Sequence, residues 1–290
     1  MEENRTKGLM LALATFVMWG VFPIFFKLIK DVNAVQILAH RVVWSFVLLL
    51  VFLCFTHRLK NVARLLSTPK IALTLLCTGL LISTNWGVYI YAVNSDQILA
   101  TSLGYFINPL FSVLLGALFL HEQLSAAAKF SLLLAFAAIG VQIYALGRLP
   151  IISLVLPLSF AFYGLIRKKV KVPSFEGLFC ETALMLLPAL AFLIYCALKG
   201  SGAFGFNVSG ALLFASGLIT ILPLLTFAAS TQYLPLSTIG FMQYISPSMS
   251  MLIAVFIYGE ELETYKILSF SLIWFGLAVV GLDGLRRKNG

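Results

Sequence analysis

Residues Leu103–Leu124 read LGYFINPLFSVLLGALFLHEQL, and a recognisable copy of this stretch returns near the C-terminus as Ile239–Leu262, IGFMQYISPSMSMLIAVFIYGEEL. Pro109 in the first copy corresponds to Pro247 in the second, and a glutamate follows thirteen residues after each proline. Each copy is apolar for long enough to cross a bilayer and ends in an acidic turn. The rest of the chain therefore reads as two halves, each built around one such helix.

Composition places the chain in a membrane. Of its 290 residues, 61% are hydrophobic and 11% are charged, and the mean hydropathy is +1.01. A soluble domain is roughly 45–50% apolar and about 25% charged, so lipid must be the solvent for much of this surface. The net charge of +9 does not indicate nucleic-acid binding, because the basic residues form short clusters between apolar runs.

The apolar runs predict ten transmembrane helices at about 20 residues per span. The longest connections, Thr56–Pro69 and Arg167–Glu176, leave no room for a soluble domain. The first apolar run is too long for a signal peptide and no A-x-A site follows it. The predicted spans are Gly8–Ile29, Val35–Phe55, Lys70–Val93, Ile98–Leu120, Ala126–Leu146, Leu149–Ile166, Gly177–Leu198, Val208–Thr231, Pro235–Tyr258 and Thr264–Leu282.

The distribution of Lys and Arg predicts the orientation. With the N-terminus inside, the inner segments hold fourteen of these residues and the outer segments hold five. Because Lys and Arg are retained on the cytoplasmic side, we expect both termini to be cytoplasmic.

The repeat extends upstream and sets the domain organisation. Thr15–Gly20, TFVMWG, is echoed by Ser159–Gly164, SFAFYG, so residues 1–147 and 148–290 each hold five predicted helices. Five is odd, so the second half enters the membrane from the opposite side. An inverted repeat of this kind is typical of secondary transporters that alternate access to a site at the midplane. Gene duplication can also leave symmetry in a channel or a scaffold.

Prolines inside the spans predict bent helices, because each removes a backbone donor. The repeat places Pro109 and Pro247 at the same depth in opposed helices. The prolines concerned are Pro23, Pro109, Pro157, Pro188, Pro223 and Pro247.

Four motifs resemble the RarD group of the EamA family, within the drug/metabolite transporter superfamily. They are Asn85–Asn94 (NWGVYIYAVN), Ser102–Leu110 (SLGYFINPL), Gly217–Leu224 (GLITILPL) and Gly240–Pro247 (GFMQYISP). The resemblance covers essentially the whole chain. It implies ten helices in two inverted halves, a central cavity between helices 1, 3, 4, 6, 8 and 9, and export of small metabolites or drugs across a bacterial inner membrane.

Polar and aromatic side chains cluster on the helices that this resemblance places around the cavity. Amides and hydroxyls inside a bilayer cost free energy unless they face protein or water, so they are either substrate ligands or links between helices. Trp19 and Tyr163 correspond in the repeat and lie too deep for an interfacial belt. The predicted substrate-binding residues are Trp19, Asn85, Trp86, Tyr89, Tyr105, Asn108, Tyr163, Thr220, Gln243 and Tyr244.

Arg41 and Glu181 are charged residues within predicted spans, and such residues are usually functional. We expect Arg41 to attract a carboxylate or cap backbone carbonyls, and Glu181 to carry a proton, because burial disfavours a charged carboxylate. The alternative is that both reach water at the interface. They lie at different depths, so we predict that they do not pair. Glu122 and Glu260 end their helices, where capping or loop contacts are expected.

No catalytic motif, phosphate-binding loop or metal-ligand cluster is present in the sequence. The four cysteines lie in apolar runs without a CxxC pattern, so we predict neither disulfides nor a metal or other cofactor. The sequence therefore predicts a non-enzymatic secondary transporter that is monomeric or homodimeric and has no ATPase partner. It would export amino acids or amphipathic drugs by alternating access with possible proton coupling. A passive channel or a non-transporting scaffold is the alternative.

Overall fold

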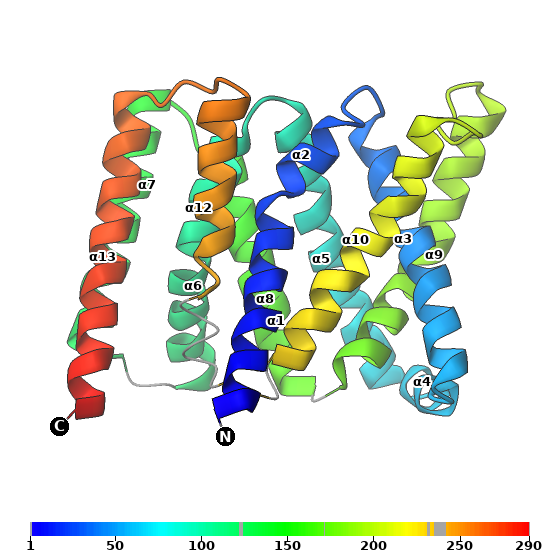
Figure 1. Cartoon of the computed structure of the whole chain (residues 1–290), viewed down its shortest axis with the longest axis horizontal. Coiled ribbons are helices and arrows are strands. Elements are labelled where there is room, and N and C mark those ends of the chain that lie inside the picture. Colours follow the sequence, from blue (N-terminus) through cyan, green and yellow to red (C-terminus); the bar gives the residue numbers. More distant parts are fainter. Residues whose placement is uncertain (1, 122–123, 171, 231–232, 235–241, 290) are drawn as a thin grey trace.

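The computed structural model describes residues 2–121, 124–170, 172–230, 233–234 and 242–289, and every regular element within these ranges is a helix. The helices form a bundle with both chain termini at one edge, called here the terminal edge (Figure 1). The elements are α1 (Glu2–Gly20), α2 (Phe22–Lys27), α3 (Ala34–Phe55), α4 (Leu59–Leu66), α5 (Pro69–Asn94), α6 (Ile98–Leu120), α7 (Ala126–Leu146), α8 (Ile151–Val170), α9 (Ser174–Leu198), α10 (Val208–Ser230), α12 (Ile245–Leu252), the π-helical turn η1 (Ile253–Ile257) and α13 (Thr264–Asn289).

The helices confirm a polytopic membrane protein. Among the described residues, eight helices are long and apolar enough to cross a bilayer. Two shorter apolar helices, Ile151–Arg167 and Ile245–Ile257, lie where the sixth and ninth spans are predicted. The predicted ninth span, Pro235–Tyr258, begins outside the described residues. The chain is therefore an all-α polytopic membrane protein, and the total of ten spans stays a prediction.

The first predicted span, Gly8–Ile29, corresponds to one candidate span over Arg5–Lys27, with an interruption inside it. Val21 has a φ of −89° and a ψ of 0°, which are not helical, and α2 then starts with Pro23 in its first turn. Proline has no N–H to continue the hydrogen-bond ladder of α1 but fits the first turn of a new helix. The N–H of Val21 still donates to the carbonyl oxygen of Val17 at 3.1 Å, so the interruption is local.

The predicted connection Thr56–Pro69 contains a short helix, α4, which was not predicted. Val62 is buried and packs with the apolar residues of α3, α5 and α9. In Figure 1, α4 lies at the terminal edge and is seen nearly end-on, whereas its neighbours run up the page. It therefore lies across the ends of the spans. The other long predicted connection, Arg167–Glu176, is shorter than expected, because α8 continues to Val170 and α9 starts at Ser174.

The most extensive helix contacts run between the two halves of the sequence. Helix α3 packs against α9 and α10, α5 packs against α9 and α8, and α1 packs against α10. The contact of α6 with α8 is matched by that of α12 with α1, and α7 packs against α13. Exchanging each helix of the first half for its counterpart in the second reproduces the same contacts. This pattern agrees with the predicted halves, whose inverted relation stays a prediction.

Two glycines allow the central helices to approach closely. A Cβ atom on Gly217 of α10 would lie 2.6 Å from the Cβ of Trp44 on α3, so a larger residue would force the helices apart. Gly79 of α5 packs against Glu181 of α9, with a Cβ position 3.3 Å from the carbonyl oxygen of that residue. Small residues at such crossings are the usual basis of helix packing in membranes. They bring the charged residues on α3 and α9 against the opposite half.

Candidate functional site

Arg41 and Glu181 are both buried. Arg41 is 3% exposed and Glu181 is 1% exposed. Arg41 lies seven residues after the start of α3, and Glu181 lies seven residues after the start of α9. Neither side chain reaches water in this structure, so the alternative of an interfacial group does not describe either of them.

The surroundings of Arg41 combine one hydroxyl with aromatic rings. Its Nε donates a hydrogen bond of 2.6 Å to Oγ1 of Thr220 on α10. The guanidinium carbon lies 4.2 Å from the ring centroid of Trp86, 5.9 Å from that of Phe22 and 5.7 Å from that of Phe26. Aromatic faces attract a cation, most strongly where water is excluded. We call Arg41, Thr220, Trp86, Phe22 and Phe26 the arginine cluster.

The arginine cluster lacks a carboxylate. Among the residues that the structure describes, no Asp or Glu oxygen lies within 4.0 Å of the guanidinium. A guanidinium has five N–H donors arranged for two-pronged binding of an anion. A buried charge is normally paired, so this geometry suits an anionic ligand.

Asn85 connects three helices beside this cluster. Its Nδ2 donates to the carbonyl oxygen of Leu156 at 2.8 Å and to Oγ of Ser159 at 3.0 Å, both on α8. The hydroxyl of Tyr105 on α6 donates to Oδ1 of Asn85 at 3.1 Å. The ring of Tyr105 lies 5.9 Å from that of Tyr89. In this structure Asn85 is therefore satisfied by protein groups, and its predicted contact with substrate stays a prediction.

Asn108 lies in the same helix as Tyr105. It is 2% exposed, and its Oδ1 is buried without a hydrogen-bond partner among the described residues. An unpartnered buried amide is uncommon, because burial without a hydrogen bond costs free energy. Asn108 thus has an acceptor left for another molecule.

Glu181 has a different environment, formed by α5 and α8. Oγ1 of Thr78 donates to Oε1 of Glu181 at 2.7 Å, and the hydroxyl of Tyr163 donates to Oε2 at 3.3 Å. Nε of Arg167 lies 3.7 Å from Oε1. The guanidinium of Arg167 occupies the space beside Gly177, where a Cβ would lie 2.0 Å from its NH1. We call Glu181, Thr78, Tyr163 and Arg167 the glutamate cluster.

The two charged residues thus have separate partners, as predicted. Trp86 lies between the two clusters. Its ring faces Arg41, and it also lines a narrow gap that Glu181 lines from the other helix. That gap is too small for a water molecule. A substrate could occupy this region only if the helices around Trp86 moved apart.

Trp19 and Tyr244 lie in other aromatic groups. The ring of Trp19 is 5.7 Å from that of Phe16 and 5.9 Å from that of Phe227. Tyr244 stacks on Phe106 with ring centroids 6.0 Å apart. Tyr163, which corresponds to Trp19 in the repeat, contacts Glu181. Gln243 is half-buried. The structure therefore divides the predicted binding residues among several clusters.

The edge opposite the termini is held by contacts between the halves. Glu260 accepts hydrogen bonds from the backbone N–H groups of Ile98 at 2.6 Å and Leu99 at 2.9 Å, which confirms the predicted capping role. Lys27 of α2 forms an ion pair with Asp96. Its ammonium also lies 5.3 Å from the ring centroid of Tyr258. The corresponding expectation for Glu122 lies outside the described residues.

Sequence reasoning missed the role of Arg167. It counts this residue among the cytoplasmic positive charges, but the side chain is only 13% exposed and turns back toward Glu181. The available signal is its spacing, because Tyr163 and Arg167 are four residues apart and share one face of α8.

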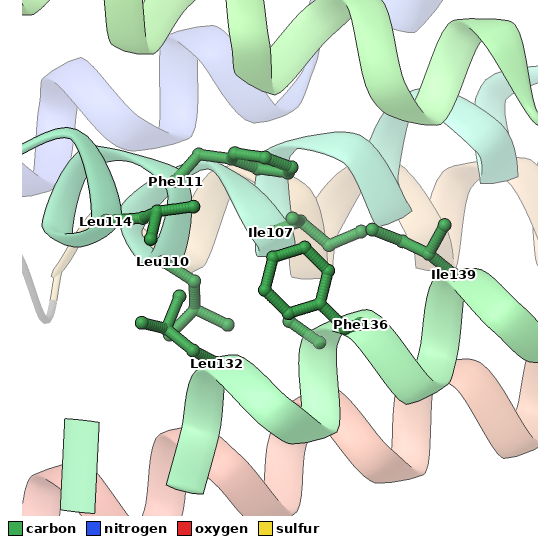
Figure 2. Close-up of a pocket in the computed structure, with 8 residues that line it drawn as sticks. Ile107, Leu110, Phe111, Leu114, Leu132, Phe136 and Ile139 are labelled. Atoms are coloured by element: carbon green, nitrogen blue, oxygen red, sulfur yellow. The ribbon is translucent and has the colours of Figure 1, made fainter. Parts of the chain in front are cut away.

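A shallow groove between α6 and α7 is a poor substrate site. Its lining is apolar throughout, as Figure 2 shows. Such a surface suits lipid chains and offers no group for a polar solute. The lining residues are Ile107, Leu110, Phe111, Leu114, Leu132, Ala135, Phe136 and Ile139.

Comparisons with known proteins cover the whole chain. The EamA-like transporter family matches it twice, at residues 6–144 and 149–282. An uncharacterized transporter of Vibrio cholerae is 42% identical, with 99% of this chain and 96% of that protein covered. Protein RarD of Escherichia coli K12 is 40% identical over 100% of this chain and 99% of that protein. The chloramphenicol-sensitive protein RarD of Pseudomonas aeruginosa is 27% identical over 97% and 95%.

A protein crystal structure shares the fold. It has a TM-score of 0.59 and 16% sequence identity, and the match covers 96% of this chain and 98% of that chain.

Proposed function

The chain belongs to the EamA-like transporter family, and from this premise we propose that it exports small metabolites bearing a carboxylate, such as amino acids, or amphipathic drugs. The proposed mechanism is alternating access between two inverted halves, with proton coupling. The helix contacts between the two halves support this mechanism, because exchanging the halves gives an equivalent second packing into which the interface could rearrange.

The observation that carries the proposal is Arg41. Placing an arginine inside a membrane protein is unfavourable unless an anion or polar groups satisfy it. Its Nε is satisfied by Thr220, while the arginine cluster offers no carboxylate among the described residues. A carboxylate of the substrate would complete the site. The single cation argues against phosphorylated sugars, which call for several central Lys or Arg residues.

The neighbouring groups suit the rest of an amphipathic substrate. Trp86, Tyr89 and Tyr105 present aromatic surface next to Arg41, and Asn108 retains a free acceptor. An acceptor at this position suits the ammonium or amide group of an amino acid or an amide-containing drug. The substrate would enter when the helices on either side of Trp86 separate.

Glu181 is the proposed proton carrier. Two hydroxyl donors and the guanidinium of Arg167 contact its carboxylate in this structure. Separation of α8 from α9 would remove Arg167 and Tyr163, and a buried carboxylate without its counter-ion takes up a proton. Helix movement and proton binding would thereby be coupled in one step.

The basic residues support the proposed orientation, with the terminal edge in the cytoplasm. Arg58, Lys60, Arg64 and Lys70 are exposed at this edge. Retention of positive charge on the cytoplasmic side places the arginine cluster toward the outside and the glutamate cluster toward the cytoplasm.

Substrate counterflow in proteoliposomes tests the proposal. The panel holds labelled amino acids and chloramphenicol, which is included because a relative is named for sensitivity to it. Transient accumulation of one compound above equilibrium is expected from a carrier. Equilibration of a solute without counterflow would instead support a passive channel. Transport without any need for a carboxylate on the substrate would contradict the role given to Arg41.

A further inference from the structure

Helix α4 has two chemically distinct faces. Val62 is 5% exposed and packs into the bundle, with Leu65 and Leu66 partly buried beside it. Lys60 and Arg64 are four residues apart and exposed, so they share the opposite face. The apolar face packs α4 across the end of the bundle, and the basic face is exposed on the protein surface.

The segment around α4 carries positive charge only. Residues 56–70 contain four Lys or Arg residues and no Asp or Glu. Arg58 has a partner, because its NH1 lies 3.7 Å from Oε1 of the buried Glu176 at the start of α9. No carboxylate oxygen of the described residues lies within 4.0 Å of Lys60, Arg64 or Lys70. Arg58 therefore ties the segment to the bundle, while the other three charges are available to a partner.

Exposed apolar side chains adjoin these charges. Phe55 at the end of α3 is 82% exposed and Leu59 at the start of α4 is 37% exposed. A soluble acidic partner or free phosphate would leave this apolar surface in water. A lipid offers both an anionic headgroup and an acyl chain, which is the combination that amphipathic basic helices bind at a membrane surface.

We propose that Lys60, Arg64 and Lys70, together with Phe55 and Leu59, form a binding site for an anionic phospholipid at the terminal edge. The headgroup phosphate contacts the three cations, and the acyl chains pass along Phe55. The site is separate from the arginine and glutamate clusters. It does not depend on which solute the protein transports.

Native mass spectrometry of the detergent-solubilised full chain tests this site. Phosphatidylglycerol and phosphatidylcholine with identical acyl chains are titrated against the protein at low ionic strength. Each basic residue near an anionic headgroup strengthens binding roughly fivefold at low salt. The wild type is expected to prefer phosphatidylglycerol, and the triple variant K60Q/R64Q/K70Q is expected to lose that preference by more than tenfold.

A matched variant distinguishes loss of this site from loss of net positive charge. The variant K30Q/R148Q/K199Q removes three exposed basic residues from the opposite edge, and it is expected to keep the wild-type preference. An equal loss in both triple variants would overturn the proposal, as would full preference in K60Q/R64Q/K70Q. Binding of chain-free glycerophosphoglycerol as tightly as phosphatidylglycerol, measured at the same ionic strength, would show that no lipid chain is recognised, which also overturns it.

The wild type alone provides a further test that needs no variant to fold. Raising the salt concentration screens exposed charges, so the preference for phosphatidylglycerol is expected to fall steadily. A preference that does not change with salt would contradict an electrostatic site.

Discussion

The arginine cluster and the glutamate cluster are related by the sequence repeat, yet only one of them contains its own counter-ion. Both charges lie at the same position in corresponding helices, α3 and α9. Both bond to a threonine of the opposite half, Thr220 for Arg41 and Thr78 for Glu181. Glu181 also faces Arg167, whereas Arg41 faces aromatic rings.

This difference assigns different chemistry to similar positions. A buried charge that has an internal partner can release or regain that partner as helices move, which suits binding and release of a proton. A buried charge without an internal partner requires one from outside, which suits a substrate carboxylate. Duplication of the sequence would thus have produced two equivalent positions. Later substitutions around each position would have given the two charged residues different roles.

The largest expected effect comes from Arg41→Gln. Removing one member of a buried hydrogen-bonded charge pair costs about 2–5 kcal/mol, so we expect substrate counterflow to fall by roughly 100-fold. Arg41→Lys keeps the charge but not the two-pronged geometry and should be intermediate. Thr220→Val is the matched control, since it removes only the neutral partner. Counterflow in Arg41→Gln within twofold of the wild type would contradict the proposal that Arg41 binds the substrate carboxylate.

Glu181→Gln tests the proposed proton role. The amide cannot carry a proton in the same way, so we expect counterflow without a pH gradient to persist while stimulation by a gradient disappears. Transport is measured in proteoliposomes with and without an imposed gradient. Thr78→Val serves as the control because it leaves the carboxylate in place. Full pH-driven transport by Glu181→Gln would count against proton coupling through this residue.

Asn85 and Asn108 provide a comparison within the substrate region. Asn85→Leu removes the acceptor of the Tyr105 hydroxyl and two hydrogen bonds to α8, which should lower the free energy of unfolding by about 1–3 kcal/mol. Asn108→Leu removes an acceptor that has no described partner, so it should affect transport more than stability. Thermal denaturation and counterflow of both variants are compared. A loss of stability in Asn108→Leu together with a loss of transport in Asn85→Leu would show that Asn108 is the structural link.

The smallest expected effect is that of Glu260→Gln. The variant keeps the size of the side chain but loses the charge that favours the start of α6, an effect of about 1 kcal/mol or less. The contact between the halves should weaken slightly and open this edge more often. A membrane-impermeant maleimide would label a cysteine placed at Ser102, with the four native cysteines replaced. Unchanged labelling, within a twofold margin, would mean that Glu260 only caps the helix.

Most helix boundaries could be predicted because they depend on local composition. The predicted spans Ile98–Leu120 and Ala126–Leu146 coincide with α6 and α7. The first span was predicted as one helix, and the structure interrupts it at Val21, two residues before Pro23. Helix α4 was not predicted, because an eight-residue helix gains its stability from packing Val62 against α9 and not from its own length.

The candidate site was predicted in part. Arg41 and Glu181 stand out because charges are rare in apolar runs, and their lack of mutual pairing follows from their positions along the helices. Arg167 does not stand out, since a lysine- and arginine-rich helix end normally faces water. Its inward direction depends on the absence of a side chain at Gly177 and on the carboxylate of Glu181. Both lie on α9, which the sequence of α8 cannot reveal.

The sequence by itself determined that this chain is a helical membrane protein with an internal repeat and two charged residues, Arg41 and Glu181, inside its spans, because hydropathy and rare residue types act through local composition. The tertiary structure alone decided which neighbours each charge has. Thr220 reaches Arg41, and Thr78 reaches Glu181, only because glycines allow distant helices to approach closely. Partner choice depends on side-chain directions across helix crossings, and those directions are set by packing between segments far apart in the chain.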